Sequence, residues 1–256
     1  MPHLPSRITV VGATAVTAII ALGVGTAFAA SGSSTTTGAA AATTRNGSHA
    51  KDPKIPQDAT LQQIQAAAAT AISKRVSSLN TAIAKVDKTA DLGSDQATLL
   101  GTLRSDETGL TQLGQTIAGD NTLPTAKTDY KEIFSDYRVY ALVLPVTRQV
   151  VVDDRIINTA GARLTKVAAR IAAHETPADQ TEVQALLTDL ANQVSAATAA
   201  VKGQPATLEG YTPADWNANH QLLNTARSAT KTAVADLVKA RSDAKQAAAD
   251  EGLKVR

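Results

Sequence analysis

The segment from residue 130 to residue 145 concentrates the side chains that could bind a ligand. Beyond residue 29 the chain has only two aromatic residues outside this segment, Tyr211 and Trp216. Aromatic faces beside a few hydrogen-bonding groups suit a polar ligand such as a glycan or a peptide. The same rings could instead fill the core between helices, which the sequence favours because aromatic side chains dominate core energetics. The candidate contact residues are Tyr130, Phe134, Asp136, Tyr137, Arg138 and Tyr140.

Two adjacent carboxyl groups, Asp153 and Asp154, directly follow a run of three valines at 150–152. On a partly buried helix, one of these carboxyl groups could have a raised pKa. The simpler interpretation is that one turns to solvent while the other meets Arg148 or Arg155. The pair is therefore a weak indication of a catalytic site.

Other chemistry-bearing patterns are missing from the sequence. The four histidines are His3, His49, His174 and His220, and none lies at metal-ligand spacing from another ligand. The sequence has no Glu-x-x-His or His-Glu-x-x-His pattern, no Ca²⁺ loop and no Gly-rich phosphate loop. It also has no cysteine and no Gly-x-Ser-x-Gly elbow. We therefore predict no catalytic residue, no metal and no cofactor.

Most of the chain around these candidate residues shows the apolar periodicity of α-helices. Apolar residues recur at three- and four-residue steps from Leu61 to Val86, and a second stripe runs from Leu100 to Ile117. These stripes predict an antiparallel hairpin over 58–119. A crossing is expected over 120–145, with a short helix near 125–136 and an extended or kinked stretch before Pro145.

The same arrangement is predicted again in the second half of the chain. A hairpin is expected over 146–203, and a C-terminal helix over 212–250. Thr-Pro-Ala-Asp at 176–179 and again at 212–215 is typical of a helix start. The predicted fold is all-α, an elongated bundle of hairpins within a helical domain at 58–256. The pattern at 75–83 resembles that at 163–171, which indicates either an internal duplication or the general likeness of Ala-rich helices.

The first thirty residues predict export. Arg7 precedes an uncharged stretch from Ile8 to Ala30, and Ala27 and Ala29 form a small-residue signal-peptidase site, so that 1–29 is a signal peptide. The alternative is a retained membrane anchor, because the stretch is long enough to span a bilayer. Either interpretation places the remainder outside the cytoplasm. Residues 30–57 are rich in Ser, Thr and Ala, which predicts a disordered tether.

The balance of charged residues limits which kinds of partner the protein could bind. Residues 30–256 carry 24 basic and 23 acidic residues; this balance excludes the basic face that nucleic-acid binding needs. The tether together with the run Asp136–Pro145 resembles uncharacterised exported proteins of high-GC Gram-positive bacteria, a resemblance that implies no activity.

Two functions remain open. One is a structural or interaction protein with an envelope component or protein as partner; the other is an extracytoplasmic ligand-binding protein or enzyme. The oligomeric state is not indicated.

Overall fold

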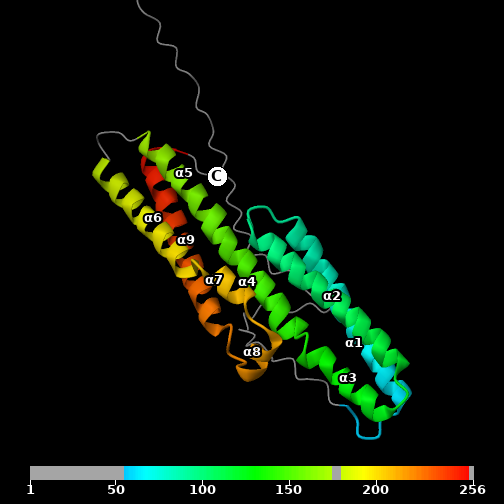
Figure 1. The fold of residues 1–256 in the computed structure, drawn as a ribbon. Coiled ribbons are helices and arrows are strands. Elements are labelled where there is room, and N and C mark those ends of the chain that lie inside the picture. Colours follow the sequence, from blue (N-terminus) through cyan, green and yellow to red (C-terminus); the bar gives the residue numbers. More distant parts are fainter. Residues whose placement is uncertain (1–54, 175–179, 254–256) are drawn as a thin grey trace, which may run out of the picture.

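The protein is helical throughout the part that the structure covers. The structure, a computed structural model, describes residues 55–174 and 180–253. Within these ranges every regular element is a helix, which confirms the predicted all-α class (Figure 1). The predicted signal peptide at 1–29, residues 30–54 of the predicted tether and the helix-start signal at 176–179 lie outside the described residues.

Helices α1 (Leu61–Asp87) and α2 (Asp95–Gly119) pack against each other in antiparallel directions. Gln65 at the start of α1 donates to the carbonyl oxygens that end α2, with 3.2 Å from Nε2 to the oxygen of Ile117. Gln96 at the start of α2 donates in turn to the end of α1, with 3.0 Å to the oxygen of Val86. Each helix thus satisfies carbonyl groups that its partner leaves without an intrahelical donor.

A short helix, α3 (Leu123–Ser135), leads into one long helical run. The run consists of the π-helix η1 (Val139–Val143), α4 (Leu144–Arg155), the π-helix η2 (Ile156–Ala160) and α5 (Gly161–Ala172). We call it the central run.

Of the two alternatives predicted for the stretch before Pro145, extended or kinked, the extended one is wrong and the kinked one agrees with the structure. The chain turns at a single residue, Arg138, whose φ is 41°, and helix resumes at Val139. Pro145 lies within the first two positions of α4, directly after η1. Proline cannot donate an intrahelical hydrogen bond and its ring crowds the preceding turn, and a wide π turn accommodates both effects.

The second half contains α6 (Gln180–Val201), α7 (Gln204–Glu209), α8 (Pro213–Ala218) and α9 (Asn224–Asp250). Helices α6 and α9 lie side by side along most of their lengths, and α5 contacts both (Figure 1). The helix predicted over 212–250 is divided in two, because Asn219 leaves helical backbone at φ −143° and ψ 97°.

Buried apolar residues form two cores. The N-terminal core joins α1, α2, α3, η1 and the first half of α4, with Leu208, Trp216 and Leu223 added from the second half. The C-terminal core joins η2, α5, α6 and α9. The central run passes from one core to the other between Val150 and Ile156. Among the described residues, no helix combines the length and apolar character needed to cross a membrane.

Candidate functional site

Two of the six candidate residues stack on a cation of the protein itself, and a third packs against one of those two. The guanidinium carbon of Arg75 lies 4.3 Å from the ring centroid of Phe134 and 5.1 Å from that of Tyr140. Tyr130 is 7% exposed and packs edge-on against Phe134 at 5.2 Å between centroids. Burial raises the pKa of Tyr130, and the positive charge of Arg75 partly offsets that rise. We call these four residues the arginine cage.

Tyr140 covers the outer side of the arginine cage. Its hydroxyl group donates to the carbonyl oxygen of Lys74 at 3.1 Å and lies 3.2 Å from Oγ of Ser78, both on α1. Its side chain nevertheless remains 41% exposed. The ring is therefore fixed by α1 on one face and open to solvent on another.

Tyr137 faces a different helix. A Cβ atom added to Gly109 of α2 would lie 2.7 Å from the Tyr137 hydroxyl oxygen, so the absence of a side chain at Gly109 makes room for the ring. Burial raises the pKa of Tyr137, and the Asp106 carboxylate raises it further. Asp106 has a buried Oδ2 without a donor, and burial raises its pKa to about 6.

Asp136 and Arg138 belong to the turn between α3 and the central run. Asp136 is exposed and accepts a hydrogen bond from Oγ of Ser135 at 2.6 Å. Arg138 Nε donates to Oδ1 of Asn217 in α8 at 2.6 Å, and Asn217 Nδ2 donates back to the carbonyl oxygen of Ser135 at 3.1 Å. The six candidate residues thus contact α1, α2 and α8, and whether any of them contacts a ligand stays a prediction.

Sequence reasoning missed Arg75, which lies over two of the candidate rings. Arg75 lies on α1 beside the apolar stripe, next to Val76, and no local pattern links it to Phe134 or Tyr140. The only signal available was its position at the edge of that stripe, where an arginine stem can lie along apolar surface.

Asp153 and Asp154 differ from the sequence prediction. Both are buried, at 0% and 4% exposed, so the expectation that one would turn to solvent is wrong. Asp153 Oδ1 accepts hydrogen bonds from Oγ1 of Thr230 at 2.6 Å and from Nε2 of Gln149 at 3.2 Å. Burial raises the pKa of Asp153 to about 6, although these two donors act in the opposite direction. Thr230 and Gln149 also bond to each other.

A second carboxyl cluster lies next to the first. The pKa of Asp154 is raised to about 7, first by burial and then by the neighbouring acids Asp95, Glu209 and Asp153. Burial, followed by the charge of Asp95, also raises the pKa of Glu209 to about 7. Oδ2 of Asp154 and Oε1 of Glu209 are buried without a donor. We call Asp95, Asp154 and Glu209 the acidic triad. Across 55–174 and 180–253, no group of three or more His, Cys, Asp or Glu side chains has a geometry that could hold a metal ion.

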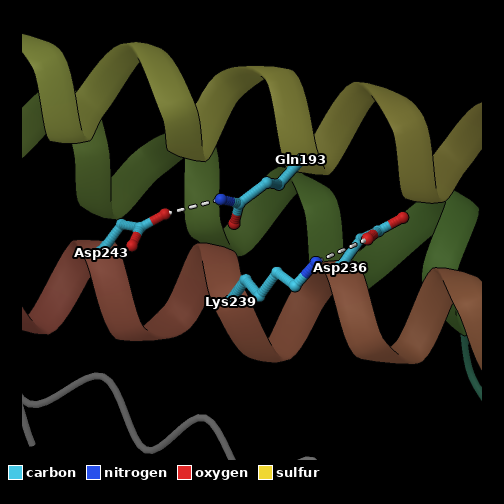
Figure 2. A network of polar contacts seen from close by, with 4 residues as sticks. All are labelled: Gln193, Asp236, Lys239 and Asp243. Atoms are coloured by element: carbon cyan, nitrogen blue, oxygen red, sulfur yellow. Dashed lines mark hydrogen bonds and ion pairs between the residues drawn. The ribbon is translucent and has the colours of Figure 1, made fainter.

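Three further polar contacts lie away from the aromatic segment and the carboxyl clusters, and one of them joins two helices. His174 is exposed, and its Nδ1 lies 2.9 Å from the carbonyl oxygen of Arg170. Figure 2 shows Gln193 of α6 reaching Asp243 of α9, with 2.8 Å from Nε2 to Oδ2. Beside it, Lys239 and Asp236 pair along α9 at 3.9 Å. Neither contact has the geometry of a catalytic pair.

Comparison with protein-family models, with curated proteins and with solved structures found no match for this chain.

Proposed function

We propose that this protein is an exported helical structural or interaction protein of the cell envelope or extracellular space, and that it is not an enzyme. The leader and the Ser/Thr-rich tether in the sequence support export. The arginine cage carries the structural part of the proposal. Phe134 and Tyr140 stack on Arg75 rather than on an empty space, so their faces serve the fold.

The proposal assigns the aromatic segment a scaffolding role. Through it, the turn at Arg138 attaches to α1, α2 and α8 at once. An extracytoplasmic helical protein without cysteine must be held together by such packing, since no disulfide is available.

The second candidate function is an extracytoplasmic protein that binds a small ligand or glycan, or an enzyme acting there, with the aromatic segment as its site. One observation favours it. Tyr140 is 41% exposed, one of two large apolar residues that are exposed among the described ones, and Asp136 beside the same turn is also exposed. An exposed ring next to polar groups suits a glycan face.

Fractionation of a high-GC Gram-positive host that expresses the full chain with a C-terminal tag tests the first proposal. We expect the protein in the envelope or culture fraction, with a mature N-terminus at Ala30. Recovery from the cytoplasm with Met1 intact would contradict export. Recovery from the membrane with an intact leader would identify the anchored form.

One double variant separates the candidate functions. Asp136→Asn with Tyr140→Phe removes the exposed charge and the exposed hydroxyl group while keeping the ring over Arg75. If the protein is a scaffold, this variant sediments with purified envelope as the unchanged protein does. A loss of glycan-dependent thermal stabilisation in this variant, with an unchanged melting temperature in buffer, would favour the ligand-binding function.

A further inference from the structure

A polar seam separates the two cores. Along the central run the last buried residue of the N-terminal core is Val150 and the first of the C-terminal core is Ile156. Between them, Asp153 and Asp154 are buried at 0% and 4% exposed. Burying a carboxyl group costs free energy unless it finds partners. The contacts of these two groups therefore decide how firmly the neighbouring helices attach to the central run.

Asp153 has its partners. Thr230 of α9 donates at 2.6 Å and Gln149 of α4 donates at 3.2 Å. Both donors are neutral and both remain donors at any pH at which the protein folds. This half of the seam fixes α9 to the central run.

Asp154 has no neutral donor of this kind. Its Oδ2 is buried without a donor, as is Oε1 of Glu209, and the group that shares a side-chain hydrogen bond with Asp154 is another acid, Asp95. The groups that face it are all acids: Asp95 from α2, Glu209 from α7 and Asp153 from its own helix. Two carboxyl groups can share a hydrogen bond only when one of them holds a proton. The acidic triad therefore needs a proton to be satisfied.

Both basic side chains of α4 lie at exposed positions, as do three on the helices packed against it, whereas Asp154 is buried. The η2 segment contains no titratable side chain, and α1 contributes buried apolar residues such as Val86. These basic residues are Lys85 of α1, Arg148 and Arg155 of α4, and Arg227 and Lys231 of α9. The groups that act on the Asp154 carboxyl group are acids, and a proton is the cation that neighbouring carboxyl groups can share directly.

We propose that the acidic triad is a proton-controlled latch, which holds α7 on the central run while it shares a proton and releases α7 when that proton is lost. Helix α7 places Leu208, 1% exposed, in the N-terminal core, and it follows directly on α6 of the C-terminal core. Release of α7 therefore loosens the connection between the two cores. The latch stands independently of where the protein acts.

The pH range over which α7 is released follows from the pKa values of Asp154 and Glu209. Asp154 and Glu209 titrate near a pKa of about 7 when α7 is docked, and near the ordinary pKa of about 4 when α7 is released. Between these values the docked form holds more protons. The equilibrium constant for release therefore rises with pH, by about tenfold per pH unit for each proton involved, and levels off above about pH 7.

Hydrogen–deuterium exchange of the full chain, followed by mass spectrometry, tests the latch. Protection of a peptide spanning 202–212 is measured from about pH 4.5 to about pH 8 and corrected for intrinsic exchange. We expect protection to fall as pH rises toward 7. In Asp154→Asn and in Glu209→Gln the pH slope should decrease, and in the double variant it should vanish. Asp106→Asn is the matched control, since it removes a buried acid elsewhere and should leave the slope at 202–212 unchanged.

Three results would overturn the latch. The first is protection at 202–212 that does not depend on pH in the unchanged protein. The second is an unchanged slope in Glu209→Gln, a variant at a half-buried position that serves if Asp154→Asn fails to fold. The third is recovery of protection at about pH 8 on adding millimolar calcium and its loss with a chelator, which would assign the triad to a metal ion instead of a proton.

Discussion

The two cores achieve burial with different side chains. The N-terminal core and the residues packed against it contain five of the six aromatic residues among the described ones, and the sixth, Tyr140, is exposed beside α1. The C-terminal core contains none. Its interior combines aliphatic residues with a series of alanines, which are Ala160, Ala197, Ala233, Ala240, Ala244, Ala247 and Ala248.

The difference shows two ways of fixing helices. The alanine face of α9 packs against α6, whose buried residues are mainly aliphatic, and the two helices run side by side over most of their lengths (Figure 1). Aromatic rings instead require particular neighbours. Phe134 and Tyr140 need Arg75, and Tyr137 needs the space above Gly109. The N-terminal half should therefore respond more specifically to substitution.

The largest expected effect comes from removing a buried leucine in each core. Leu103 is 0% and Leu237 is 1% exposed. Truncation of either to alanine should cost about 2–5 kcal/mol of unfolding free energy. Leu103→Ala should lie nearer the upper end, because rigid rings close a cavity less readily than Ala-rich helices do. Urea denaturation measures both. A greater loss in Leu237→Ala would contradict the contrast between the cores.

Asp106 makes the stability of the protein depend on pH through a group in the N-terminal half. The pKa of Asp106 is raised to about 6 from 3.8 by burial, so the native state holds this proton more tightly than the unfolded state between those values. Stability from this group is therefore highest at acid pH and decreases as pH rises from about 4 to about 6.

Asp106→Asn should abolish that decrease and stabilise the protein at pH 7 by about 1–2 kcal/mol, a value reduced for partial solvent screening. Urea denaturation at a series of pH values measures it. Parallel pH profiles for the variant and the unchanged protein would show that Asp106 is solvated in solution.

Arg75→Met tests the arginine cage. Methionine keeps the apolar stem but loses the charge over the rings of Phe134 and Tyr140, which should cost about 1 kcal/mol. The near-ultraviolet circular dichroism of the tyrosines should change as well. Lys74→Met, at an exposed neighbouring position, is the control. Equal stability losses in the two variants would mean that Arg75 acts only through local helix effects.

The smallest expected effect is the difference between alanine substitutions at two glycines of α2. A Cβ atom at Gly101 meets nothing within 4 Å, whereas one at Gly109 would meet the Tyr137 hydroxyl oxygen at 2.7 Å. Gly101→Ala should stabilise the protein by about 0.5–1 kcal/mol through helix propensity. Gly109→Ala should lose that gain or become destabilising, because the ring must move. Thermal unfolding measures both, and equal gains would show that Tyr137 moves away freely.

Much of the fold could be predicted from local sequence. The stripes in α1 and α2 account for their buried faces, and Thr212-Pro213 correctly indicates the start of α8. Local patterns failed where two effects compete over a few residues. Pro145 and the preceding strand-forming residues indicate a break, yet the chain turns earlier, at Arg138, and a π turn accommodates the proline.

The candidate site was harder to predict. The aromatic segment was recognisable from composition, but its partners Arg75 and Gly109 lie on helices remote in sequence. The exposure of Asp153 and Asp154 was also misjudged. Helical periodicity gives one helix one buried face, whereas α4 lies between α7 and α9 and is buried on more than one side.

The sequence by itself determined that this chain forms amphipathic helices and that its aromatic side chains gather at one point, because spacing and composition are local properties. Only the tertiary structure decided which groups meet. It placed Arg75 between two rings and brought Asp95 and Glu209 to Asp154. Whether a carboxyl group needs a proton depends on its burial and its neighbours, and the packing of separate helices sets both.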